Sequence, residues 1–64
     1  MTRAEIRDLA QAEGLENVRI VFLPAKGGEP AIMISWGTGL NRLAVEVPAD
    51  ADADTIRAAI AARR

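Results

Sequence analysis

A short apolar run at residues 31–36, Ala-Ile-Met-Ile-Ser-Trp, constrains this chain most strongly. A loop rich in Gly and Pro precedes the run, and a Gly-Thr-Gly turn follows it. Ile32, Ile34 and Trp36 fall at every second position, which is the side-chain period of a β-strand. The run therefore predicts a central strand with these three residues facing inward, and with Trp36 filling part of the core.

Two further runs alternate with the same period of two. Residues 18–23 predict a strand that ends at Pro24, because proline lacks the N–H that a ladder needs. Residues 42–47 predict a third strand, which Pro48 should stop. The side chains expected to face inward are Val18, Ile20, Phe22, Leu43, Val45 and Val47.

Helical patterns occupy both ends of the chain. Thr2 and Glu5 have the spacing of a capping box, and Gly14 suits the position after a helix C-terminus, so we expect a helix over residues 3–13. The acids Asp50, Asp52 and Asp54 favour a helix start with Asp50 or Asp52 as the N-cap, and they predict a second helix over residues 52–63.

These elements define one α+β domain over residues 1–64, in the order α-β-β-β-α. The short connections predict a three-stranded antiparallel meander, since hairpins need few linking residues. Each helix has a single apolar stripe, so both helices should pack on the same face of the sheet.

The opposite, outer face of the sheet is the candidate binding surface. A solvated antiparallel face normally alternates to polar residues, but several positions here are apolar. Long arginine side chains lying over scattered apolar residues would explain this face equally well. The alternative is that the face, or an edge strand beside it, meets a second chain. The partner-binding candidates are Arg19, Val21, Leu23, Met33, Arg42 and Ala44, with loop candidates Lys26, Gly27 and Gly28.

The residue inventory argues against catalysis. The chain has no His, Cys or Tyr, so the usual acid–base and nucleophile sets are missing, and we expect no enzyme and no cofactor. Asp50, Asp52 and Asp54 have the spacing that opens an EF-hand loop, but the required Gly and the final Glu do not follow. Helix capping explains these acids better than a metal site, and we expect no bound metal.

The charge balance argues against a dedicated nucleic-acid binder. Eight Lys and Arg residues against nine Asp and Glu give a net charge of −1, whereas phosphate contacts normally require a basic surface. An RNA- or DNA-binding module remains the alternative function. Its candidate basic residues are Arg19, Lys26, Arg42 and Arg57.

The element order resembles that of two known groups, the double-stranded-RNA-binding domain and the HicA-type toxins. The first resemblance implies RNA binding through lysines at the start of the last helix, where this chain has Asp50, Asp52 and Asp54. The second implies RNA cleavage by a sheet histidine, and this chain contains none. Element order is shared by many unrelated proteins, so the chain is assigned to neither group.

The sequence therefore predicts a small non-catalytic protein-interaction module. Its partner would be another protein or a second copy of the chain, and the function could be self-association, an accessory subunit or a phage-type inhibitor. No apolar run approaches the roughly 20 residues of a membrane span. With no signal-peptide pattern at the start, we expect a cytoplasmic location.

Overall fold

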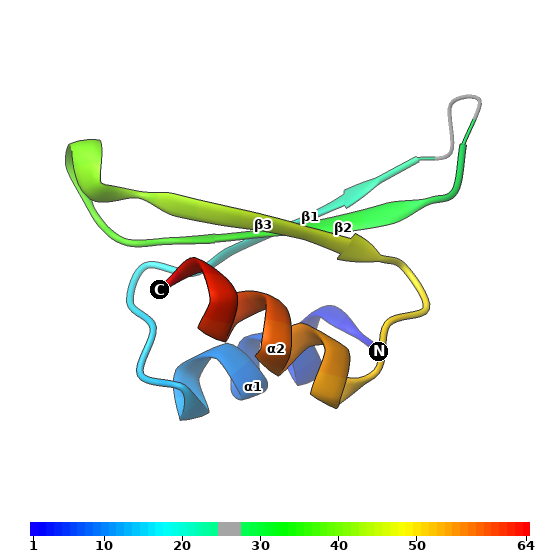
Figure 1. The fold of residues 1–64 in the computed structure, drawn as a ribbon, viewed down its shortest axis with the longest axis horizontal. Coiled ribbons are helices and arrows are strands. Elements are labelled where there is room, and N and C mark those ends of the chain that lie inside the picture. Colours follow the sequence, from blue (N-terminus) through cyan, green and yellow to red (C-terminus); the bar gives the residue numbers. More distant parts are fainter. Residues whose placement is uncertain (25–27) are drawn as a thin grey trace.

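The computed structural model, which describes residues 1–24 and 28–64, has two layers: a three-stranded sheet and a pair of helices beneath it (Figure 1). This confirms the predicted α+β class and the α-β-β-β-α order. The elements are α1 (Arg3–Ala12), β1 (Arg19–Leu23), β2 (Ala31–Trp36), the 3₁₀ turn η1 (Gly39–Asn41), β3 (Leu43–Pro48) and α2 (Ala53–Arg63).

The sheet is the predicted antiparallel meander, with strand order β1-β2-β3. Ile34, at the middle of β2, lies opposite Ile20 of β1 and Val45 of β3. Because side chains in paired positions point to the same side, these three residues face the helices together. The core that forms between sheet and helices consists of Ile6, Leu9, Ala10, Leu15, Ile20, Ile32, Ile34, Trp36, Val47, Ala51, Ile56 and Ile60.

Both helices begin with the caps that the sequence predicts. In α1, the N–H of Glu5 donates to Thr2 Oγ1 (3.2 Å) and the N–H of Thr2 donates to Glu5 Oε1 (2.7 Å). In α2, the N–H of Thr55 donates to Asp52 Oδ1 at 2.8 Å. These bonds satisfy backbone donors that a helix start otherwise leaves unpaired.

The end of α1 also follows the sequence. Gly14 has the left-handed φ of 81° that a residue after a helix end commonly needs. The N–H of the next residue, Leu15, donates to Ala10 O at 3.1 Å, and its side chain is buried. This closing turn directs the chain from the helix layer up to β1.

Several boundaries differ from the sequence prediction. Strands β1 and β3 begin one residue later than expected, so Val18 and Arg42 lie outside them. A turn was expected over residues 37–41, but its 3₁₀ segment η1 was not. The expectation that Pro48 stops the third strand is wrong, because β3 includes it. An edge strand tolerates proline where its nitrogen points away from the sheet.

The sheet is longer than the helix pair and projects beyond it at both ends (Figure 1). Phe22 was expected in the core. It shares a row with buried Ile32, yet it remains 42% exposed. The Arg3 guanidinium covers its ring, with Cζ 5.0 Å from the ring centroid. A cation over an aromatic face is favourable and replaces part of the missing packing.

Candidate interaction surface

The outer face of the sheet is uncovered by any element that the structure describes, and its centre is apolar. Val21, Met33 and Glu46 lie side by side across the three strands. Val21 is 47% exposed and Met33 is 37% exposed. Both side chains are therefore only partly covered.

The predicted candidates divide into two groups along this face. Leu23 is half-buried and shares a row with Ala31 and Pro48 at one end of the sheet. Arg19 and Ala44 are exposed and flank Ser35 toward the other end.

Arg42 is fixed in place at the second end. Its Nη1 donates to Gly37 O at 2.7 Å, and its Nη2 donates to Ser35 Oγ at 3.0 Å. The side chain is thereby held at the turn and does not lie across Val21 or Met33. The structure thus supports the assignment of Arg19 and Arg42 to the rim of the face.

The turn that holds Arg42 requires glycine at one position. Gly37 has a φ of 101°, and a Cβ there would lie 2.7 Å from Asn41 O. Gly39 also has a positive φ, but a Cβ would meet nothing within 4 Å. The Gly-Thr-Gly motif is therefore explained by backbone geometry, chiefly at Gly37.

Leu40, in η1, is a residue that the sequence reasoning missed. Its side chain is fully exposed at the β2–β3 turn. An isolated leucine between Gly39 and Asn41 gives no periodic signal, so the pattern could not identify it. Of the loop candidates, Gly28 is exposed with open space around it, whereas Lys26 and Gly27 lie outside the described residues.

The two sheet edges are less suited to docking than the face. On β1, Arg3 Nη1 donates to the outward carbonyl of Ile20, which occupies one edge acceptor. On β3, the edge carries Glu46 and ends at Pro48, which has no N–H. Charges and prolines on edge strands are common devices against strand addition.

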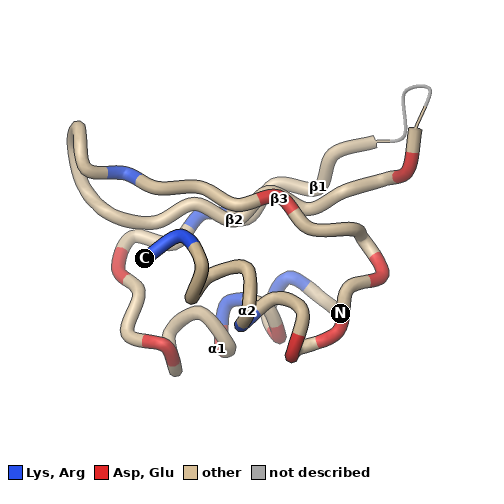
Figure 2. The backbone as a smooth tube through the Cα atoms, in the orientation of Figure 1, with Lys and Arg blue, Asp and Glu red and all other residues tan. Residues whose placement is uncertain are grey.

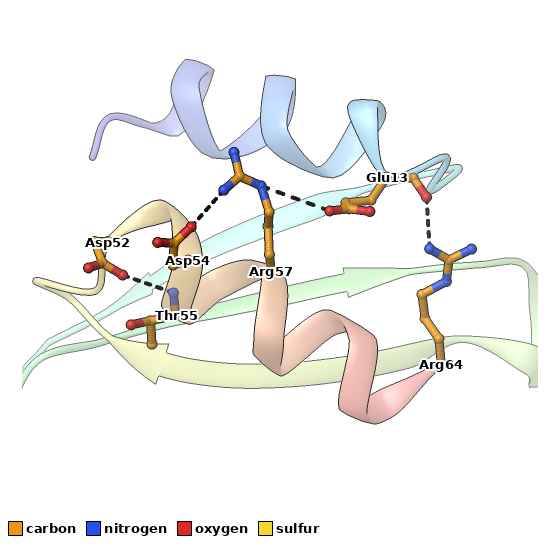
Figure 3. Close-up of polar contacts among 6 residues, drawn as sticks. All are labelled: Glu13, Asp52, Asp54, Thr55, Arg57 and Arg64. Carbon is orange, nitrogen blue, oxygen red and sulfur yellow. Dashed lines mark hydrogen bonds and ion pairs between the residues drawn. The ribbon is translucent and has the colours of Figure 1, made fainter.

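Arg57, which the nucleic-acid alternative groups with Arg19 and Arg42, belongs to the helix layer. Figure 3 shows it between the two helices, where Nη1 is 2.9 Å from Asp54 Oδ1 and Nε is 4.0 Å from Glu13 Oε1. Nearby, Arg64 Nη1 donates to Glu13 O at 2.8 Å, at the end of α1. Arg57 and the sheet arginines therefore do not form one basic patch.

Two of the three acids that open the second helix have local roles. Asp52 caps α2, and Asp54 pairs with Arg57, as Figure 3 shows. The backbone N–H of Thr55, followed by its side chain, lowers the pKa of Asp52 below its usual value. Within residues 1–24 and 28–64, no group of three or more acidic side chains is placed to hold a metal ion.

Comparison with protein-family models, with curated proteins and with solved structures finds no match for this chain. No described helix is both long and apolar enough to cross a membrane. The functional argument therefore rests on the residues of the sheet.

Proposed function

We propose that this chain is a small, non-catalytic protein-interaction module that docks a protein partner on the outer face of its sheet. The observation that carries the proposal is the position of Val21 and Met33. Both are exposed at the centre of a face left open by the described elements, while both helices pack on the opposite face. Exposed apolar side chains beside charged rims are typical of protein-binding surfaces.

The size of the face limits the kind of complex it can form. Three strands of five or six residues present roughly 250–300 Å² of flat surface at standard strand spacing. A standard interface buries about 800 Å² on each partner. The face alone therefore suits a weak contact, or the centre of an interface that also includes the ends of the sheet.

Met33 provides the sharpest test. Met33→Glu would place a carboxylate directly opposite Glu46, and like charges at paired positions destabilise a sheet. Met33→Lys avoids this repulsion and still puts a hydrated charge at the centre of the face. A matched control is Ala58→Lys, which adds the same charge at an exposed position of α2.

The measurement begins with light scattering at several concentrations and two salt levels, which reports self-association. Capture of binding partners follows, with the wild-type chain, Met33→Lys and Ala58→Lys as the three baits. We expect Met33→Lys to lose dimerisation or partner binding, and Ala58→Lys to retain it. Equal mass and equal capture for all three proteins would rule out the outer face.

The alternative, a nucleic-acid-binding module, predicts binding to mixed oligonucleotides that weakens steeply with salt. Arg19 and Arg42 are the described residues that could contribute from the sheet. Titration of the same three proteins with oligonucleotides separates the two functions, because Met33→Lys adds a positive charge. The substitution should strengthen phosphate binding while it weakens protein docking.

A further inference from the structure

A polar hollow lies at one end of the outer face, between the chain that leads into β1 and the turn that joins β2 to β3. One wall carries Asn17 and Arg19, and the other carries Thr38, Gly39 and Arg42. The two walls are joined by a hydrogen bond from Gly37 N to Glu16 O (2.9 Å). The hollow is therefore formed by backbone segments that are tied together.

The residues that line this hollow include two arginines and no acid. Among the residues that the structure describes, no carboxylate forms an ion pair with Arg19 or Arg42. Like charges that share a small site raise each other's electrostatic energy, and an anion between them would lower it. Arg42 is already oriented by Gly37 O and Ser35 Oγ, so it loses little freedom on binding. The Thr38 side chain makes no capping bond to η1, which leaves its hydroxyl available.

We infer that this hollow binds a carboxylate of the protein that docks on the outer face, so that the partner presents an acidic residue beside an apolar one. The inference rests on the proposed function, and it specifies which chemical groups the partner presents to this surface. Guanidinium groups match the geometry of a carboxylate with two parallel N–H···O bonds. The exposed apolar residues nearest to the hollow along the chain are Leu40, which follows Gly39, and Met33, which lies two residues before Ser35 on β2.

The charge distribution favours a single carboxylate over a chain of phosphates. Toward the opposite end of the sheet, Glu29 and Asp50 line a second depression together with Glu46 of the central row. Figure 2 shows a basic residue beside the β2–β3 turn and acidic residues toward the other end of the sheet. A nucleic acid that followed the face would meet these acids, whereas the residues that line the hollow include no acid.

The test is a titration of the full chain followed by NMR. The probe is hexaglutamate with an acetylated N-terminus and an amidated C-terminus, and hexaglutamine blocked in the same way is its uncharged counterpart. Heptathymidylate without terminal phosphates, which carries the same six negative charges as the blocked hexaglutamate, is the phosphate arm. We expect hexaglutamate, and not hexaglutamine, to shift the amide signals of Thr38 and Gly39 and the side-chain signals of Arg19. Arg19→Gln should weaken this binding by about fivefold to tenfold, the range expected for loss of a charge-assisted pair.

The matched control is Arg7→Gln. It removes one positive charge from an exposed site on α1 where the structure records no hydrogen bond or ion pair among described residues. It should leave the affinity within about twofold of the wild-type value, because a distant exposed charge is screened by salt. Both variants should unfold at the wild-type urea concentration.

Three results would overturn the inference: no shift at these residues with hexaglutamate, equal weakening by Arg19→Gln and Arg7→Gln, or tighter binding of heptathymidylate than of hexaglutamate. The first two results would leave the proposed function unaffected, because that function depends on Met33. Loss of partner binding in Met33→Lys with unchanged binding in Arg19→Gln would separate the face from the hollow.

Discussion

Two neighbouring residues of β2 should lose very different amounts of folding stability when each is replaced by alanine. Ile34 is completely buried against the helices, whereas Met33 lies on the open face. Truncation of a buried Ile to Ala typically costs about 2–5 kcal/mol, because transfer energy is lost and a cavity is left. Since Met33 is already 37% exposed, Met33→Ala should cost less than about 1 kcal/mol.

This difference is large relative to the whole fold. A domain of 64 residues has an expected free energy of unfolding of roughly 3–10 kcal/mol. Ile34→Ala should therefore remove about a fifth or more of the stability, and Met33→Ala much less. With a urea m-value of about 1 kcal/mol per molar, the midpoint should fall by about 2–5 M for Ile34→Ala.

Urea unfolding followed by tryptophan fluorescence measures both variants. The single Trp36 is 5% exposed in the folded chain, so its emission reports the loss of the core. Similar costs at the two positions, or a larger cost at Met33, would refute the reasoning. A larger cost at Met33 would mean that β2 is shifted by one residue, which reverses the inward and outward faces.

Two further predictions concern the turn and the helix caps. Gly37→Ala should destabilise the fold by more than about 1 kcal/mol, because the new Cβ would combine a positive φ with a close backbone contact. Gly39→Ala, where the space is open, should cost less in the same urea measurement. For the caps, hydrogen bonds lower the pKa of both Glu5 and Asp52 in the folded chain, so their stabilising effect is complete above the unfolded pKa values. Stability should fall as pH drops from about 5 through the folded pKa values, and Asp52→Asn should reduce that dependence in melting curves recorded at several pH values.

The alternation of side chains explains why the sheet could be predicted from sequence. Ile32, Ile34 and Trp36 keep a strict period of two, and all three are buried. Each position in a strand has only two choices of face, so a few apolar residues fix the orientation of all the others. The caps at Thr2 and Asp52 could also be predicted from sequence, because each depends on residues within one helical turn.

The sequence predictions that failed depend on contacts between residues distant in sequence. Phe22 fits the inward pattern, but its exposure depends on where the helices end beneath the sheet. The bond from Arg3 to the carbonyl of Ile20 joins the start of α1 to an edge strand. Alternation identifies which face a residue occupies, and it carries no information about how far the opposite layer extends.

The same limit applies to the arginines of the candidate site. By sequence alone, Arg19, Arg42 and Arg57 are equivalent cations on three different elements. The structure separates them, because Arg57 pairs with Asp54 and Glu13 between the helices, while Arg19 and Arg42 line one hollow.

The small area and the central Glu46 of the outer face give a reason to expect a partner other than an identical copy. Two copies stacked so that Met33 meets Met33 would bury little more than the flat central area, which is far below the standard interface. Such a dimer, with its symmetry axis across the strands, would also place Glu46 against Glu46 of the second copy, because both residues lie in the central row. Like charges facing each other across a desolvated contact oppose association. A different protein, with an acidic group for the arginine end and an apolar centre, avoids this repulsion and can extend over the β2–β3 turn to Leu40.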